Sequence, residues 1–237
     1  MSSRQQEKER RRAERLAKEQ EAARAVARTK RLQIAGGAVL AIAAIAVLVV
    51  VLTSGSSSSA DGPKSTADAK ANIPAAGANA NADGLPAAAK AAQCTVLNPP
   101  SEGRTHVTTT VTYKNSNPPA SGPHNPTPAQ DGIYDPGNEP AKENWVHSLE
   151  HGRIVIQYRP GTPKATIDGL ETVGSEALNG TPAYHVLGMQ NNTRMPYAVA
   201  AVAWTHVLGC NTMNPQVYDA IRAFRARYTD KGPELIP

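Results

Sequence analysis

The pattern of apolar and polar positions divides the chain at residues 34–52, where 19 consecutive residues are apolar. As a helix rising 1.5 Å per residue, this run is long enough to cross the roughly 30 Å hydrocarbon core of a bilayer. A surface helix of a soluble domain would show polar residues at every turn. We therefore predict a transmembrane helix over residues 34–53. A cleaved signal peptide is the alternative, although its apolar stretch is usually only about 7–15 residues long.

Charge is divided unequally between the two sides of this run. Residues 1–33 carry 11 Lys/Arg and 5 Asp/Glu, a net charge of +6. The part after Thr53 carries 14 Lys/Arg and 15 Asp/Glu, a net charge of −1. The positive-inside rule predicts a single-pass cell-membrane protein with residues 1–33 in the cytoplasm and the C-terminal part outside it. The lipid bilayer is then the partner of residues 34–53. Since the basic charge belongs to the N-terminal segment alone, we expect no nucleic-acid partner.

The next segment, residues 54–92, consists mostly of Ser, Ala, Gly, Asn, Asp and Pro, with hardly any large apolar side chain. Such a composition cannot bury a core, so it predicts a disordered linker. Residues 93–237 have an ordinary length for one domain with its own core. The sequence therefore predicts one extracytoplasmic globular domain on a flexible tether.

Short runs within this domain predict its secondary structure. β-branched or apolar runs predict four strands, at residues 105–113, 153–158, 183–189 and 197–207. Helical spacing predicts a helix at 166–177 and another that begins at Pro215, with Asn214 as its N-cap. Residues 114–140 contain seven prolines and are expected to form a long loop. The pattern predicts an α+β fold, a small mixed sheet with two or three helices and a long Pro-rich loop.

The chain has two cysteines, Cys94 and Cys210, near opposite ends of the predicted domain. In an oxidising compartment one disulfide between them is the natural interpretation. Closing a loop of that length stabilises a domain by about 4–5 kcal/mol in the chain-entropy model. Two buried thiols, or two metal ligands, remain the alternatives.

The most specific local pattern is WVHSLEHG at residues 145–152, in which His147 and His151 stand four apart. On a helix their Cβ atoms lie about 6 Å apart, near enough for one metal ion, whereas on a strand about 13 Å separates them. Gly152 suits the position after a helix end, which favours the helix. Glu150 lies about 60–100° from the pair around such a helix. We expect it to hydrogen-bond or ion-pair with a ligand, and no H-E-x-x-H motif is present.

A second pattern, PPASGPHNP at residues 118–126, surrounds His124 with prolines that each fix one backbone angle. A loop stiffened in this way loses little entropy on ligation, which suits a preset ligand. The alternative is a surface loop that the prolines merely shape, with His124 capping a turn. His106 lies within the first predicted strand, where packing is as natural a role as ligation.

The remaining histidines and methionines are weaker candidates. His185 and His206 lie in apolar strand contexts, where we expect hydrogen-bonded core histidines. Met189, Met195 and Met213 could be soft copper ligands, but methionine more often fills a core. The sequence contains no G-x-S-x-G elbow, phosphate loop or dinucleotide-binding fingerprint, so no enzyme class is indicated.

Together these motifs resemble a bacterial family, domain-of-unknown-function family 3105. The shared features are PPxSGPHxP, GxY, VHSLEHG before a strand, and a late GPE, here at residues 118–126, 132–134, 146–152 and 232–234. His106 matches an upstream histidine of the family, whereas Ala120 stands where threonine is commoner. The similarity covers nearly all of residues 93–237. It implies a single-span or exported protein and no established activity.

Three functions follow from these observations. The first is a membrane-anchored extracytoplasmic domain that binds a transition metal, copper or zinc, through His124, His147 and His151, with His106 as a fourth candidate ligand. Their rings are then expected within about 4 Å of one another. The second is a non-catalytic envelope interaction domain with structural histidines and an unidentified envelope protein as partner. The third is a metal-dependent enzyme, a hydrolase or an oxidoreductase.

Overall fold

The computed structural model describes residues 62–237 apart from 69, 235 and 237. The predicted cytoplasmic segment 1–33, the predicted transmembrane helix 34–53 and the start of the predicted linker lie outside the described residues. Among the residues that are described, no helix is both long enough and apolar enough to cross a bilayer.

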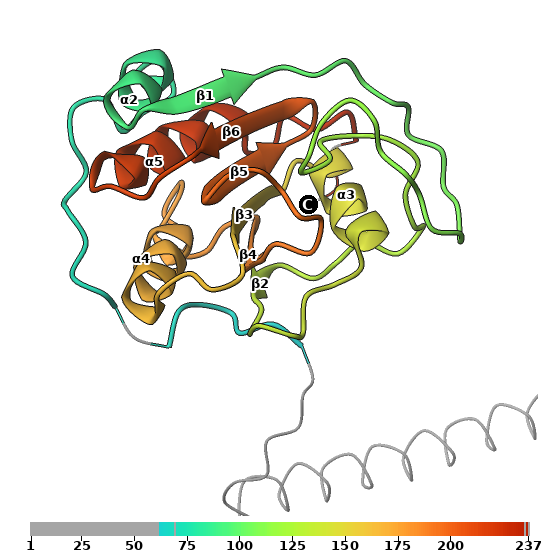
Figure 1. The fold of residues 1–237 in the computed structure, drawn as a ribbon, viewed down its shortest axis with the longest axis horizontal. Helices are drawn as coiled ribbons and strands as arrows, with labels where there is room; N and C mark the ends of the chain where they lie inside the picture. The colour runs from blue at the N-terminus through green and yellow to red at the C-terminus, as the bar shows by residue number, and fades with distance from the viewer. Residues whose placement is uncertain (1–61, 69, 235, 237) are drawn as a thin grey trace, which may run out of the picture. The chain divides into compact units, whose positions relative to one another are not determined.

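The centre of the domain is a six-stranded mixed sheet with the order β1-β6-β5-β3-β4-β2 (Figure 1). The strands are β1 Cys94–Leu97, β2 Gly132–Ile133, β3 Ile154–Tyr158, β4 Val186–Gln190, β5 Val199–Ala203 and β6 His206–Cys210. Strands β2, β3 and β4 run parallel to one another, and the other neighbours are antiparallel. The prediction of a mixed sheet in an α+β domain is therefore confirmed.

Four helices cover the two faces of this sheet. They are α2 Leu85–Ala91, α3 Lys142–Glu150, α4 Lys164–Ser175 and α5 Gln216–Tyr228. Helices α2, α4 and α5 pack on one side, which we call the helical face, and α3 lies on the other side with the long loops, which we call the loop face (Figure 1). The described residues thus contain one helix more than the two or three predicted.

Each face of the sheet has its own apolar core, because successive strand residues point to opposite sides. Ile154 and Ile156 of β3 join Phe224 of α5 in the core of the helical face. Val155, between them, joins Trp145 of α3 in the core of the loop face. All five side chains are essentially inaccessible to solvent.

The first part of the described chain corrects the prediction of a disordered linker over residues 54–92. In the structure Leu85, Ala88 and Ala89 of α2 are buried in the core of the helical face. Upstream of α2, the backbone N–H of Ala67 donates a hydrogen bond of 2.8 Å to the Ser175 hydroxyl. Large side chains are not needed here, because small alanines allow α2 to pack closely on α5.

Two predicted strands also differ from the structure. Residues 105–113 form only an isolated bridge between His106 and His124, because the neighbouring Pro-rich loop supplies no continuous row of backbone donors. Residues 197–207 form two strands, β5 and β6, joined by a turn at which Thr205 has a φ of 61°. No Gly, Asn or Pro indicated that turn in the sequence.

The other predicted elements are confirmed within a few residues. Strands β3 and β4 and helix α4 occupy the predicted positions, and the 114–140 segment is a long loop that contains only the two-residue strand β2. The Asn214 side-chain oxygen accepts a hydrogen bond of 3.0 Å from the N–H of Gln216 at the start of α5. Cys94 and Cys210 form the predicted disulfide, directly opposite one another in the β1–β6 pair.

Candidate metal centre

Helix α3 presents the predicted histidine pair on the loop face. Trp145, Val146 and Leu149 of this helix are fully buried in the core of the loop face. The helix ends at Glu150, and His151 is its C-cap. Gly152 follows with a φ of +79° and donates a hydrogen bond of 3.0 Å to the Leu149 carbonyl, as expected for a glycine after a helix end.

The Pro-rich loop brings His124 to this helix through a tight backbone arrangement. Gly122 has a φ of +126°, and a side chain at this position would collide with the Tyr113 ring. The Tyr113 hydroxyl donates a hydrogen bond of 2.8 Å to the carbonyl of Pro123. The glycine of the SGPH motif is therefore required by sterics, and the loop holds the His124 backbone in one place.

His106 is held beside His124 by the isolated bridge between their two segments. The N–H of His124 donates to the Thr105 carbonyl at 3.0 Å, and the N–H of Val107 donates to the His124 carbonyl at 2.7 Å. The two ring centroids lie 5.1 Å apart. The predicted strand is absent, but its histidine still reaches the site.

Four side chains converge in what we call the inner cluster: His106, His124, His147 and Glu150. One ligand atom from each lies within 4.8 Å of the corresponding atom of the others. His124 is 0 % exposed and Glu150 is 2 % exposed, whereas the side chain of His106 is about half exposed. Three of the four predicted ligands therefore come together with the glutamate that was expected only to support them.

The remaining predicted ligand, His151, belongs to a second group, which we call the outer cluster: His147, His151 and Glu234. His124, His147 and His151 therefore do not fall into one group within 4.8 Å, and their ligation of a metal stays a prediction. His151 is the C-cap residue, with a backbone that has left the helical conformation (φ −81°, ψ 11°). The two clusters share His147 and no other residue.

The protonation of His124 follows from its partners. Its Nδ1 lies 2.7 Å from the Gly122 carbonyl, which can only accept, so Nδ1 carries the proton in the neutral ring. Nε2 is then a bare lone pair. It is buried and lies 2.8 Å from Oε2 of Glu150, yet the two atoms are not aligned as a hydrogen bond. Two atoms that can each ligate a cation therefore face each other in the protein interior.

His147 is held in the same manner at Nδ1, but its Nε2 has a hydrogen-bond partner. Its Nδ1 donates a hydrogen bond of 2.6 Å to the Asn125 carbonyl, and its Nε2 lies 2.9 Å from Nε2 of His151. A histidine that donates Nδ1–H to a backbone carbonyl while aiming Nε2 inward is typical of metal sites. The hydrogen bond fixes both the tautomer and the ring orientation.

Burial favours the neutral form of His147 and His151. Burial lowers the pKa of His147 below its usual range, and the nearby His124 and His106 lower it further. Burial also lowers the pKa of His151, with additional repulsion from His147 and Arg153. Neutral imidazole is the form that ligates a metal.

Two carboxylates of the clusters escaped the sequence analysis as candidate ligands. Glu150 was placed too far around the helix, although its flexible side chain reaches His124. Glu234 belongs to the GPE motif, which was the available signal. A side chain at Gly232 would collide with the Glu150 carbonyl oxygen, and the N–H of Glu234 donates to that oxygen at 3.1 Å. The motif therefore docks the C-terminal segment on the end of α3.

The remaining histidines lie outside both clusters. His185 Nδ1 lies 2.6 Å from Oδ1 of Asp230, and His206 Nδ1 lies 2.6 Å from Oδ1 of Asn98. Both are hydrogen-bonded as predicted, but half-buried and not in the core. The methionines fill space: Met189 and Met195 are buried, and Met213 packs against the helical-face core.

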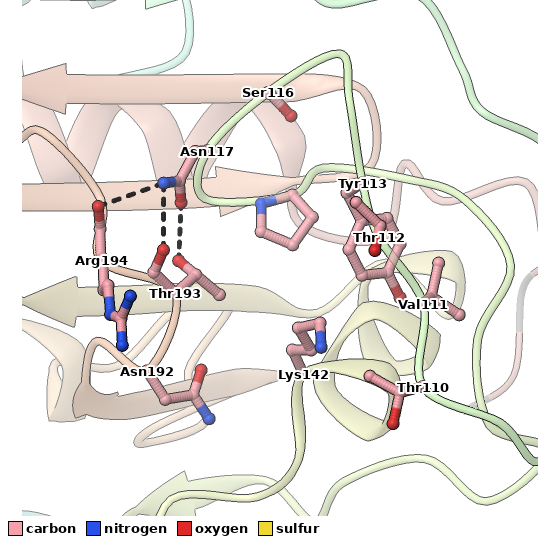
Figure 2. Close-up of a pocket in the computed structure, with 11 residues that line it drawn as sticks. Thr110, Val111, Thr112, Tyr113, Ser116, Asn117, Lys142, Asn192, Thr193 and Arg194 are labelled. Atoms are coloured by element: carbon pink, nitrogen blue, oxygen red, sulfur yellow. Dashed lines mark hydrogen bonds between the residues drawn. The ribbon is translucent and has the colours of Figure 1, made fainter.

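Two of the cavities among the described residues bear on access to the clusters. The one in Figure 2, of about 440 Å³, is lined by residues outside both clusters, and the amide of its Asn117 is already hydrogen-bonded to Thr193 and Arg194. The other, of about 360 Å³, is lined by His106 and its neighbours Val107, Thr108, Thr109 and Pro126. The second cavity gives access to a residue of the inner cluster, and the first does not.

Comparison with known proteins places these features in one family. A protein-family model described as a protein of unknown function, DUF3105, matches residues 106–235, more than half of the 237-residue chain. That range includes every residue of both clusters. No curated protein and no solved structure shows a significant match to the chain. The chain belongs to the DUF3105 family of proteins of unknown function.

Proposed function

We propose that the domain binds one transition-metal ion, copper or zinc, through His106, His124, His147 and Glu150. The single observation that carries this proposal is the buried Nε2 of His124, which has no hydrogen-bond partner and lies 2.8 Å from the Glu150 carboxylate. An unpartnered polar atom in the interior costs free energy, and in the neutral tautomer its lone pair faces that of the carboxylate. A bound cation removes both penalties.

The donor set is chemically suited to such an ion. Three imidazole nitrogens and one carboxylate oxygen form a four-ligand site of the kind that zinc and copper(II) take. Hard cations such as magnesium and calcium prefer oxygen ligands and are disfavoured here. The absence of sulfur from the set makes copper(II) a better occupant than copper(I).

Preorganisation supports the same conclusion. The backbone carbonyls of Gly122 and Asn125 fix the rings of His124 and His147 before any ion arrives. Both carbonyls belong to the Pro-rich loop, in which proline restricts the backbone. Little conformational entropy is then lost on binding, which raises affinity.

We further propose that this domain lies outside the cytoplasm, anchored by residues 34–53. Two observations support the location. The Cys94–Cys210 disulfide is typical of oxidising compartments. The excess of basic residues before the apolar run favours an N-terminus in the cytoplasm.

Metal analysis of the full chain, purified in detergent, tests the metal proposal. We expect nearly one copper or zinc ion per chain, abolished by His147→Ala combined with His151→Ala and strongly reduced by Glu150→Gln. His206→Gln is the matched control, since His206 lies outside both clusters. Metal-free protein whose stability does not change when either ion is added would contradict the proposal and favour the envelope interaction domain.

Metal-dependent catalysis is a second candidate, favoured by the cavity beside the half-exposed His106. Catalytic metal sites keep one position open to a substrate, whereas structural sites are closed. Hydrolysis of a generic ester by the zinc-loaded chain, lost in Glu150→Gln and retained in His206→Gln, would support this candidate. Ester hydrolysis no faster than in buffer would leave metal binding alone.

A further inference from the structure

The two clusters share one histidine, and this sharing carries a further inference that rests on the metal-binding proposal. We propose that the outer cluster, His147, His151 and Glu234, is a transfer position through which the ion reaches and leaves the inner cluster. In this arrangement His147 passes the ion between two sets of ligands. The outer cluster is a second metal site that the ion occupies in transit.

The chemistry of His147 makes the two positions alternatives for one ion. Its Nδ1–H donates to the Asn125 carbonyl at 2.6 Å, so only Nε2 is free to ligate. Nε2 belongs to both donor groups. One lone pair serves one ion at a time, which excludes simultaneous occupation through this ring.

Solvent reaches each cluster through one exposed side chain. Glu234 of the outer cluster has 46 % of its side chain accessible and His106 of the inner cluster 48 %. By contrast, His151 is 7 % and His124 0 % exposed. The contacts form a continuous path inward: Oε2 of Glu234 lies 3.6 Å from Nε2 of His151, which lies 2.9 Å from Nε2 of His147. Beyond His147 lie His124 and Glu150 of the inner cluster.

Backbone hydrogen bonds hold the residue that carries the outer carboxylate, Glu234, next to the residue that carries the inner one, Glu150. The N–H of Glu234 donates to the Glu150 carbonyl at 3.1 Å, and the N–H of Asp230 donates to the Gly152 carbonyl at 2.9 Å. Gly232 packs directly against the Glu150 carbonyl. The segment that carries Glu234 is therefore fastened to the end of the helix that carries the inner ligands.

The ligand counts make the outer cluster the weaker position. It offers two imidazoles and one exposed carboxylate, against three imidazoles and one buried carboxylate in the inner cluster. The ion therefore rests in the inner cluster. From there, exchange of ligands one at a time through His147 and His151 has a lower barrier than release with all four bonds broken.

The outer cluster speeds metal uptake and release and leaves the equilibrium affinity almost unchanged, because a transfer position lowers the free-energy barrier in both directions. The test uses the full chain in detergent, loaded with zinc ion. Zinc release is followed by stopped-flow mixing with a fluorescent chelator, and affinity is measured by competition with the same chelator. We expect Glu234→Gln to slow both uptake and release by about tenfold, which corresponds to about 1.4 kcal/mol of barrier.

The matched control is Glu139→Gln, another loop-face glutamate, which accepts hydrogen bonds from Gly137 and Gln190 outside both clusters. This control should leave the rates unchanged. His151→Asn, a second variant of the outer cluster, should slow exchange in the same way as Glu234→Gln. His124→Ala should weaken affinity instead.

Two outcomes overturn the proposal while leaving metal binding intact. Unchanged exchange rates in Glu234→Gln and His151→Asn would assign the route to the cavity beside His106. Affinity reduced in Glu234→Gln as strongly as in His124→Ala would make Glu234 a ligand of a single resting site. A wild-type chain that binds no zinc or copper would instead contradict the proposed function itself.

Discussion

The two faces of the sheet bury different kinds of side chain. The helical face buries hydrocarbon together with Arg225, whose guanidinium donates to backbone carbonyls, whereas the loop face buries an apolar core together with a group of histidines and Glu150. Hydrocarbon burial is favourable without any further partner. Buried polar groups are costly unless each is matched. The helical face is mostly hydrocarbon, and under the proposed function an ion completes the loop face.

This difference separates stability from binding. Changes on the helical face should lower the free energy of unfolding and leave metal affinity unchanged. Changes in the clusters should alter affinity strongly and the stability of the metal-free protein only slightly. Sites on opposite faces with no shared partners are expected to contribute almost additively.

The largest effect is expected from removing the disulfide on the helical face. Cys94 and Cys210 are 116 residues apart, so the double substitution to alanine should lower the free energy of unfolding by about 4–5 kcal/mol in the chain-entropy model. Urea denaturation with and without the substitutions measures this loss, and reduced wild-type protein should reproduce it. Metal affinity should stay within the error of the wild-type value. A large loss of affinity would show that the two faces are coupled.

The core of the helical face should be nearly as sensitive. Phe224→Ala removes a fully buried aromatic ring between α5 and the sheet and should cost about 3–5 kcal/mol of unfolding free energy. Phe224→Leu is the matched control, because it retains most of the buried hydrocarbon and should cost clearly less. Equal losses for the two variants, or a loss of bound metal in either, would contradict the separation of roles.

The same contrast explains which features the sequence could predict. Helices α3 and α5 show an apolar stripe at helical spacing, and Asn214 and Gly152 mark an end of each. Helix α2 lacks large apolar residues, so its composition resembled that of a linker. Its alanines become informative only against α5, which lies far along the chain.

The residues of the candidate site also divide into those that a local sequence pattern indicated and those that only a tertiary contact places. His147 and His124 were chosen as candidates because a local pattern predicts the position of each side chain. The patterns are a histidine pair at helical spacing and a proline-stiffened loop. The contribution of Glu234 depends on the backbone hydrogen bond to Glu150, a tertiary contact that no local pattern encodes. The bond from Val107 to the His124 carbonyl, which places His106, is of the same kind.

Metal addition should give the next largest effect, and it comes from the loop face. Zinc at a concentration of about one hundred times Kd should raise the free energy of unfolding by about 2.7 kcal/mol, because it binds only the folded state. Urea denaturation of chelator-treated and zinc-loaded protein measures the increment. Phe224→Ala should retain the increment, and Glu150→Gln should lose most of it. An increment of the same size in Glu150→Gln would place the ion elsewhere.

Glu150→Gln should have the opposite effect on metal-free protein. After a rotation of the substituted side chain, its amide nitrogen can donate to Nε2 of the neutral His124 ring, an atom that lacks a hydrogen-bond partner in the wild type. We expect the metal-free variant to be about 1 kcal/mol more stable than metal-free wild type. Denaturation in the presence of a chelator measures the difference. A clear loss of stability would mean that the cluster is a structural network and not an incomplete metal site.

The smallest effect concerns His206, whose ring stacks on Tyr228 of α5 away from both clusters. Burial lowers the pKa of His206 below its usual range, and Arg227 lowers it further. Above the ordinary histidine pKa of about 6.5, the ring is neutral in both states and its contribution to stability is fully present. At lower pH the unfolded chain binds the proton more readily, so stability falls as the pH falls.

His206→Gln cannot titrate and should remove a small part of this acid-induced loss. The free energy of unfolding of metal-free wild type and variant, measured in chelator from about pH 7 to about pH 5, gives the two slopes. We expect a slightly shallower slope in the variant, because the loop-face histidines with lowered pKa continue to titrate. Identical slopes would mean that His206 protonates equally in both states. A steeper slope would mean that Arg227 is outweighed by an acidic neighbour.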